Sequence, residues 1–264
     1  MRKPTGLGIV ELGKQIGLSK STVSRIEQGE RVPTDAELHL ILGALGVVGS
    51  AREALRKLAA EAHEPNWLAT GGTGLPEQLT TLVDYESTAT AITEVGLVVV
   101  PGLLQTREYC RAIYLSAGVP RNEIDTRVST RLGRQRILTD TTPVEFNAVI
   151  DEAALRRPVG GSAAVADQLR HLLKMGERDN ITVQVLPQSL GAHPGVDGSY
   201  VLMEFAAESP IVHLEQYRAG AFLDDREDVE AYRSLTDILR RDALSPAESA
   251  GLIRDCITEQ ESTG

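Results

Sequence analysis

Cysteine is scarce in this sequence, and long apolar runs are missing from it. Cys110 and Cys256 are the only cysteines and lie far apart, so the sequence predicts neither a disulfide framework nor a cysteine-based metal site. The longest apolar run, GLVVVPGLL, is broken by Pro101 and is shorter than the ~18–20 residues that cross a bilayer. The N-terminus has no apolar segment typical of secretory signals. These features predict a soluble, cytoplasmic protein with no membrane partner.

Motifs of the common enzyme classes are also missing. The sequence has no nucleophile elbow, no glycine-rich phosphate-binding loop and no helix with paired metal-binding histidines. The polar groups that remain as candidates for catalysis are Asp151, Glu152, His193, Asp197, His213 and Glu215. His193 in GAHPG is typical of a loop, and His213 in IVHLEQ is typical of a strand face. We therefore expect a protein that is not an enzyme, with no cofactor and no metal site.

Charge is distributed unevenly along the chain. Residues 1–32 have six basic and three acidic side chains, a net charge of +3, whereas the whole chain has −10. The other 232 residues therefore carry −13. A weakly basic head on an acidic body is typical of a small nucleic-acid-binding module fused to another domain. Because phosphate repels the acidic body, we expect any DNA contact to come from the head.

Residues 1–62 have the pattern of a compact all-helical domain. The apolar spacing in IVELGKQIG predicts a first helix that ends at Gly17. Ser19 is a suitable N-cap for a second helix over residues 20–28, which Gly29 stops. Two capping boxes predict the starts of two further helices, Thr34 with Glu37 and Ser50 with Glu53.

The second of these helices has a polar face suited to the major groove. Val23 and Ile26 point toward the expected core, and the opposite face is polar. Arginine pairs with guanine, glutamine with adenine, and hydroxyl groups with base edges or phosphates. The candidate DNA-binding residues are Lys20, Ser21, Thr22, Ser24, Arg25 and Gln28. They predict a helix-turn-helix that binds double-stranded DNA; an ordinary helical hairpin with a polar surface is the alternative.

Residues 63–76, rich in Gly, Pro and Thr, are interpreted as a linker to a second domain at residues 77–260. Helical periodicity and β-branched runs both occur in this domain and predict an α+β fold with a small sheet. The expected helices cover residues 77–93, 106–117, 121–138, 162–177, 226–243 and 246–259. The expected strands are VEFNAVI, ITVQVLP, SYVLMEF and IVHLEQ.

A partner or ligand surface is a further hypothesis for this domain. Arg127, Arg131 and Arg134 share one helix face that suits an anion, a DNA phosphate or an acidic partner protein. The alternative is a solvated face paired with neighbouring carboxylates. The segment VPGLLQT, which contains Gln105, is interpreted as a turn before a helix capped by Thr106, with a ligand or partner surface as the second interpretation.

The segment LGIVELGKQIGLSKSTVSRIEQGERVP resembles the helix-turn-helix of the Cro and phage-repressor (XRE-type) superfamily. The matching positions are Leu12, Gly17, Ser19, Ser21, Val23, Ser24, Ile26, Glu27, Gly29 and Pro33. The resemblance implies that bases are contacted by Lys20, Ser21, Ser24 and Arg25. It also implies that Thr22 contacts the DNA backbone.

The head departs from that family at its start. Members begin with a full helix ahead of the motif, whereas here only MRKPTG precedes it. The helix that would come before IVELGKQIG, which is the first helix of the family's domain, is therefore expected to be truncated. Either the true start lies upstream, or this copy folds and binds poorly. Relatives pair an Arg with the Glu that matches Glu27, and Arg2 falls in that place. Gly8 and Ile9 stand where the family has a Ser or Asn cap followed by a phosphate-binding Gln.

Residues 75–259 resemble the C-terminal domain of the WhiJ-like regulators of actinobacteria. The resemblance rests on VVVPGLLQTREYCRAIY, RLGRQRIL, VIDEAALRRPVGG, QLRHLL, ITVQVLP and ALSPAESAGLI. It implies an antitoxin-like domain and a small acidic partner protein. Because paired half-sites are the rule for helix-turn-helix proteins, we also expect a homodimer.

Together these patterns predict a sequence-specific DNA-binding transcriptional regulator with a C-terminal sensing or interaction domain. The alternative is an antitoxin-like partner-binding protein whose DNA-binding module is residual.

Overall fold

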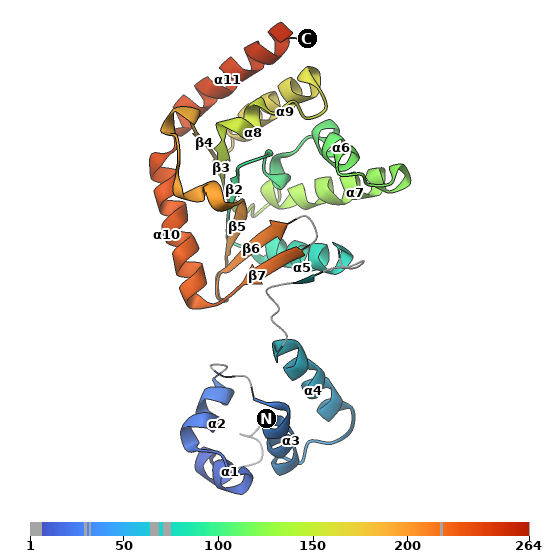
Figure 1. Ribbon diagram of the computed structural model, residues 1–264, viewed down its shortest axis with the longest axis vertical. Coiled ribbons are helices and arrows are strands. Elements are labelled where there is room, and N and C mark those ends of the chain that lie inside the picture. The colour runs from blue at the N-terminus through green and yellow to red at the C-terminus, as the bar shows by residue number, and fades with distance from the viewer. Residues whose placement is uncertain are drawn as a thin grey trace. The chain divides into compact units, whose positions relative to one another are not determined.

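A computed structural model describes residues 7–28, 31, 33–63, 69–70, 75–216 and 219–263. The chain divides into two compact units, Met1–Leu68 and Ala69–Gly264. The first unit is helical, and in the second unit helices cover a sheet (Figure 1). This is the expected combination of an all-α domain and an α+β domain.

The first unit is built from four short helices. They are α1 (Ile9–Ile16), α2 (Lys20–Glu27), α3 (Asp35–Ala44) and α4 (Gly49–His63). Leu12, Ile16 and Val23 are buried together and form the centre of its core. The predicted cap at Thr34 is present, because its hydroxyl accepts a hydrogen bond from the Glu37 N–H. The helix α4 begins at Gly49, so Ser50 lies within the first turn rather than at the cap.

Gly17 makes the tight turn between α1 and α2 possible. Its φ of +74° is in the left-handed region, where a side chain costs energy. At Gly13 on α1 the reason for glycine is close packing, because an added Cβ would lie 2.6 Å from the Leu18 carbonyl oxygen. Glycine at both positions therefore lets the chain turn sharply and the two helices pack closely.

The second unit contains one mixed sheet with strand order β1-β7-β6-β5-β2-β3-β4. Its strands are β1 (Ala69–Thr70), β2 (Ala91–Gly96), β3 (Glu145–Asp151), β4 (Ile181–Leu186), β5 (Tyr200–Glu204), β6 (Ile211–Gln216) and β7 (Ala219–Leu223). β2, β3 and β4 are parallel, and the remaining neighbours pair antiparallel. β2 is therefore the strand at which the parallel and the antiparallel parts meet.

Helices cover both faces of this sheet. The α-helices are α5 (Leu75–Thr88), α6 (Arg107–Ser116), α7 (Arg121–Arg134), α8 (Glu152–Arg156), α9 (Ser162–Met175), α10 (Arg226–Asp242) and α11 (Pro246–Thr263). The 3₁₀ helices are η2 (Gly102–Leu104), η3 (Gln135–Leu138), η4 (Gln188–Leu190) and η5 (Pro194–Asp197). The helices α6 to α9 lie in the crossovers between the parallel strands, and α10 lies on the other side of the sheet (Figure 1).

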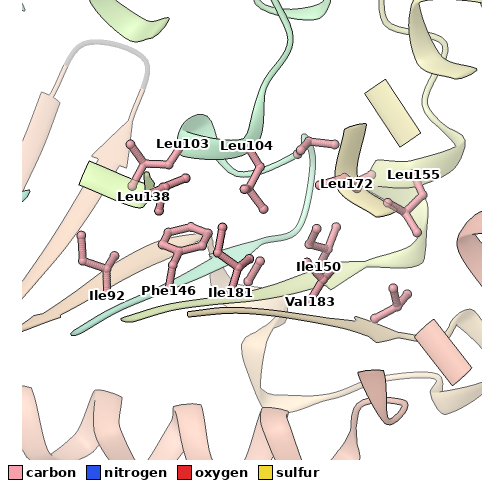
Figure 2. Close-up of a cluster of buried hydrophobic side chains, with 14 of the residues drawn as sticks. Ile92, Leu103, Leu104, Leu138, Phe146, Ile150, Leu155, Leu172, Ile181 and Val183 are labelled. Carbon is pink, nitrogen blue, oxygen red and sulfur yellow. The ribbon is translucent and has the colours of Figure 1, made fainter. Parts of the chain in front are cut away.

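The main core lies between the sheet and the crossover helices. Ile92, Phe146 and Ile181 point from three neighbouring strands toward Leu103 and Leu104 of η2 (Figure 2). On the opposite face of the sheet, Val95 of β2, Val149 of β3 and Tyr200 of β5 form a second cluster with Leu239 of α10. The two clusters follow from the alternation of side chains along a strand.

The structure corrects several details of the sequence-based prediction. The helix expected over residues 77–93 ends at Thr88, and β2 follows it. β7 was not predicted either, because AGAFL has few of the residues favoured in strands. The sheet is therefore larger than expected, with six strands of five to seven residues and the two-residue β1.

The expected linker at 63–76 also differs at both ends. The helix α4 extends to His63, and α5 begins at Leu75. Ala69 and Thr70 pair with β7 as strand β1. The other expected helices begin within one residue of the observed ones. Among the described residues, none of the helices combines the length and the hydropathy that crossing a membrane requires.

Candidate nucleic-acid interface

The helix α2 has one buried side and one polar side, as predicted. Val23 is 1% exposed and packs in the core of the first unit, and Ile26 is half-buried. The exposed members of the predicted DNA-binding set are Lys20, Ser21, Arg25 and Gln28. Thr22 and Ser24 are half-buried. Residues 21, 24, 25 and 28 follow a helical repeat, so their side chains share the face opposite Val23, and Lys20 lies at the start of the helix beside that face.

The N-terminus of α2 contains a cluster of three hydroxyl groups centred on Ser19. The Ser19 Oγ accepts a hydrogen bond from the Thr22 N–H at 3.1 Å, which confirms the predicted N-cap. The same oxygen lies 2.9 Å from the Ser21 Oγ and 2.8 Å from the Thr22 Oγ1. The hydroxyls of Ser21 and Thr22 are thereby oriented by the cap. Ser19 contributes to the face as a positioning residue, a role that its N-cap signal alone did not reveal.

Some expectations for the head lie outside the described residues. The truncated first helix and the position of Arg2 concern residues before Leu7. At the start of α1, Gly8 provides no side-chain cap, and its N–H donates to the Glu11 carboxylate at 3.1 Å. Arg31 forms a 2.9 Å ion pair with Glu37. The hydrogen bond from the Thr34 N–H, together with Arg31, lowers the pKa of Glu37.

In the second unit, side chains bond to several backbone groups of the VPGLLQT turn. The Gln105 Nε2 donates to the Val100 carbonyl at 2.8 Å, and Gln105 itself is 1% exposed. Gln168 from α9 donates to the Leu104 carbonyl and accepts from the Thr106 N–H, both at 2.7 Å. The sequence-based interpretation of this segment as a turn before the helix at Thr106 fits these contacts. Gln168 was missed, because its partners lie more than 60 residues away.

The arginines predicted to form one anion-binding face have separate roles. Arg134 is buried and bonded to Glu86 on α5, and Arg127 pairs with Glu123 one turn away at 2.9 Å. Arg131 donates to the Gln105 Oε1 at 3.0 Å and lies over the Tyr114 ring, 5.1 Å from its centre. Within the described residues Arg131 has no carboxylate partner. The structure thus brings Gln105 and Arg131 together and engages Arg134 and Arg127 elsewhere.

Both units match known families. A family model described as "Domain of unknown function (DUF5753)" matches residues 79–255, about two thirds of the chain. The chain belongs to this family. A second model, described as "Helix-turn-helix domain", matches residues 1–55. The first unit is therefore a helix-turn-helix domain, and the second unit is a DUF5753 domain.

Other comparisons add little. No curated protein matches the chain. A solved structure of TrmBL2, an archaeal chromatin protein described as showing a novel mode of DNA binding, aligns with 86% of this chain and 72% of that chain. The TM-score is 0.33 and the sequence identity is 11%. At these values the alignment supports no argument about fold or function.

In the DUF5753 domain, the structure brings His193 and Asp151 together among the polar residues that were considered for catalysis, and places His213 on β6. The His193 Nε2 lies 3.2 Å from the Asp151 Oδ2, and the Asp151 Oδ1 caps α8. His213 is buried on β6 and stacks on Phe222, with ring centres 4.6 Å apart. Burial lowers the pKa of His213, with Glu215 opposing that effect. Within the part of the chain that the structure describes, no group of three or more His, Cys, Asp or Glu side chains is arranged to hold a metal ion.

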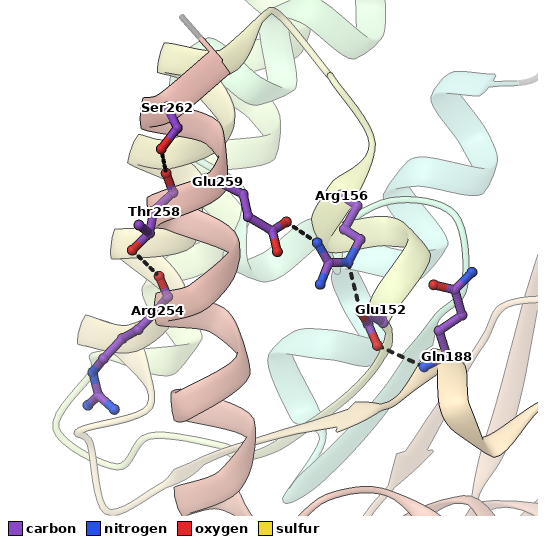
Figure 3. A network of polar contacts seen from close by, with 7 residues as sticks. All are labelled: Glu152, Arg156, Gln188, Arg254, Thr258, Glu259 and Ser262. Carbon is purple, nitrogen blue, oxygen red and sulfur yellow. Dashed lines mark hydrogen bonds and ion pairs between the residues drawn. The ribbon is translucent and has the colours of Figure 1, made fainter.

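Glu152 belongs to a polar chain that links α8, α11 and the loop after β4. Its carboxylate accepts from the Arg156 Nε at 2.7 Å and from the Gln188 N–H at 2.8 Å (Figure 3). Arg156 also pairs with Glu259 on α11. The hydrogen bonds from the Gln188 N–H and from Arg156 lower the pKa of Glu152 despite its burial. These contacts join elements of the fold, and nothing in them requires a substrate.

Proposed function

We propose that this protein is a sequence-specific DNA-binding transcriptional regulator of the XRE type that acts in the cytoplasm. The observation that supports the proposal best is the polar face of α2. Ser21, Arg25 and Gln28 are exposed there, opposite the buried Val23, and Lys20 is exposed at the start of the helix, in a unit that matches a helix-turn-helix family. In such units this helix enters the major groove.

Base recognition is assigned to Arg25, with Ser24 and Gln28 beside it. Arg25 is exposed, and its guanidinium suits the two acceptors on the major-groove edge of guanine. Replacing Arg25 with Ala is expected to cost about 1–3 kcal/mol at the specific site and to relax the base preference there. Fluorescence anisotropy on a selected operator and on scrambled duplexes measures both effects.

The control is Arg52→Ala, which removes the same charge from α4 and leaves α2 unchanged. It is expected to weaken binding to the operator and to scrambled DNA equally, or not at all. Unchanged affinity and base preference in Arg25→Ala would remove the assignment of α2 as the recognition helix.

Contact with the DNA backbone is assigned to Thr22 near the start of α2, and Lys20→Ala tests whether Lys20, whose matching family position faces bases, contacts phosphate instead. A lysine that contacts phosphate contributes to affinity through counterion release and not through base readout. Lys20→Ala is expected to weaken binding to all sequences and to reduce the salt slope by about 1. A loss confined to the operator sequence would instead place Lys20 at a base edge.

For the DUF5753 domain we propose an interaction role similar to that of the WhiJ-like, antitoxin-like regulators of actinobacteria. The supporting observation is charge: residues 107–138 contain seven arginines and three carboxylates, in a body of strongly negative charge. Of these arginines, Arg107, Arg121, Arg131 and Arg136 form no ion pair with a carboxylate among the described residues. This surface suits a small acidic protein, and a homodimer would place two recognition helices on paired half-sites.

Co-expression with a small acidic protein encoded beside the gene tests this second role. The double variant Arg127→Ala and Arg131→Ala is expected to lose co-purification, whereas Arg178→Ala, exposed between α9 and β4, keeps it. Equal recovery of the acidic protein with both variants would exclude the surface formed by residues 107–138 as its binding site. Sedimentation of the full chain alone reports whether it is a dimer.

A further inference from the structure

The DUF5753 domain contains a cavity of about 230 Å³ that the proposed DNA contact does not use. It lies between η5, the end of β6 and the second and third turns of α10. Leu214 from β6, Leu235 from α10 and Pro194 from η5 supply its apolar walls. The volume is below the ~300–1,000 Å³ of sites for drug-sized ligands, so it suits a smaller molecule.

The cavity lies at the edge of the sheet where ligands commonly bind in open sheets. Tyr200 at the start of β5 pairs with Val95 near the end of β2, and also with Leu214 beside the cavity. The cavity therefore opens where the parallel strands end. β2 pairs parallel with β3 and antiparallel with β5, so the cavity lies beside the boundary between the parallel and the antiparallel parts of the sheet.

The rim formed by η5 is held in place by packing and hydrogen bonds. A Cβ at Gly195 would lie 2.9 Å from the Leu239 side chain and 3.2 Å from the His193 Nδ1. His193 bonds to Asp151 at the end of β3. The Ser199 Oγ accepts from the Leu97 N–H at 3.1 Å. The cavity is thus largely formed before any ligand enters.

Polar side chains also line the cavity: Asp197 and Gln216 are exposed to solvent, and Tyr232 is half-buried. Across the described ranges, the side chains of Asp197, Gln216 and Tyr232 make no hydrogen bond or ion pair within the protein. Burial raises the pKa of Tyr232, and the carboxylates of Asp228 and Asp197 raise it further. None of the described lining residues is a lysine, arginine or histidine. The described part of the lining thus contributes one carboxylate and no basic side chain.

We propose that this cavity binds a small organic cation, an ammonium group on an apolar body. The body packs against Leu214 and Leu235, and the ammonium group forms an ion pair with Asp197. The Tyr232 ring and hydroxyl lie in the same wall and suit a cation. This inference does not depend on DNA binding by the first unit, and it goes beyond the interaction role proposed for the DUF5753 domain.

Ligand-observed NMR on the full chain tests the proposal with three matched probes. Benzylammonium is the cation, benzyl alcohol the neutral analogue and phenylacetate the anion. We expect benzylammonium to bind with a dissociation constant of about 1 mM or lower, benzyl alcohol more weakly, and phenylacetate not at all. Equal binding of phenylacetate, or no binding of benzylammonium, would overturn the proposal.

Variants locate the binding. Asp197→Asn is expected to weaken benzylammonium binding about tenfold or more and to leave benzyl alcohol binding unchanged. The control Asp237→Asn removes an exposed carboxylate from α10 away from the cavity. It is expected to leave the binding of benzylammonium and of benzyl alcohol unchanged. Ala231→Trp fills the cavity from an exposed helical position, which preserves the fold, and is expected to abolish both. Binding that survives Ala231→Trp places the ligand elsewhere and refutes this site.

Discussion

The carboxylate of Glu86 on α5 accepts two hydrogen bonds from the guanidinium of Arg134 on α7, at 2.6 and 2.8 Å. The Glu86 side chain is 3% exposed and that of Arg134 is 9% exposed. These two hydrogen bonds join α5 to α7 through residues that lie 48 positions apart in the chain. It also explains why Arg134 is not available to an external anion, although the sequence places it on one face with Arg127 and Arg131.

Breaking this pair from one side is expected to destabilise the domain strongly. Glu86→Leu leaves the Arg134 guanidinium buried and unpaired, which costs about 3–5 kcal/mol. Adding Arg134→Met is expected to recover part of that loss, because no buried charge then remains. Urea unfolding of the full chain measures the free energy. Glu123→Gln, which breaks an exposed pair with Arg127, is the control and costs about 0–1 kcal/mol. The free energy of unfolding is also measured for Arg134→Met alone. A loss in the double variant equal to the sum of the losses in the two single variants would contradict this account.

The buried amide of Gln168 is expected to be essential for the VPGLLQT turn. Gln168→Met keeps the length of the side chain but leaves the Leu104 carbonyl and the Thr106 N–H without partners. Each lost partner costs about 1–3 kcal/mol. Asp167→Asn, at the neighbouring position where the side chain is 72% exposed, is the control and is expected to be neutral. Hydrogen exchange of the Thr106 amide should accelerate in Gln168→Met alone. Unchanged protection there would show that the amide does not support the turn.

Glu94 on β2 is expected to make the stability of the domain depend on pH. Burial raises its pKa from the usual 4.5 to about 7, against the hydrogen bond from the Gly102 N–H and the charge of Arg134. Between these pH values the folded protein keeps a proton that the unfolded chain has lost. The contribution of Glu94 is therefore fully present below pH 4.5 and is lost as the pH rises through about 7.

Replacing Glu94 with Gln is expected to remove this dependence. Its amide oxygen still accepts from Gly102, but the side chain no longer titrates. The variant should gain stability relative to the original protein as the pH rises from 5 to 8, measured by urea unfolding at each pH. Glu145→Gln, exposed at the start of β3, is the control and should follow the original profile. Parallel profiles for Glu94→Gln and the original protein would contradict the raised pKa.

Two glycines of the first unit are expected to respond in opposite directions to alanine. Gly17 has a φ of +74°, so Gly17→Ala is expected to destabilise the unit by about 1–2 kcal/mol. Gly43 lies inside α3, where an added Cβ contacts nothing within 4 Å, so Gly43→Ala is expected to stabilise it by about 0.5–1 kcal/mol. Hydrogen exchange of the α1 amides in the full chain reports both changes. A shift of the same sign in both variants would refute the conformational argument.

The features that the sequence by itself determined are local ones. The N-caps at Ser19, Thr34 and Thr106 are present as predicted, because a cap bonds to an N–H only three residues ahead. The polar face of α2 opposite Val23 follows from helical periodicity alone. The starts of α7, α9, α10 and α11 were also predicted at the observed residues.

Only the tertiary structure decided the features that join distant segments. β2 carries Thr93 and Glu94 in its interior, so its pattern did not distinguish a central strand from a helix. Its pairing with β3 on one side and β5 on the other makes it a central strand. The partners of Gln168 and Arg134 lie 48 to 64 residues away in sequence. Such contacts depend on which elements the sheet brings together, and local propensity carries no information about that arrangement.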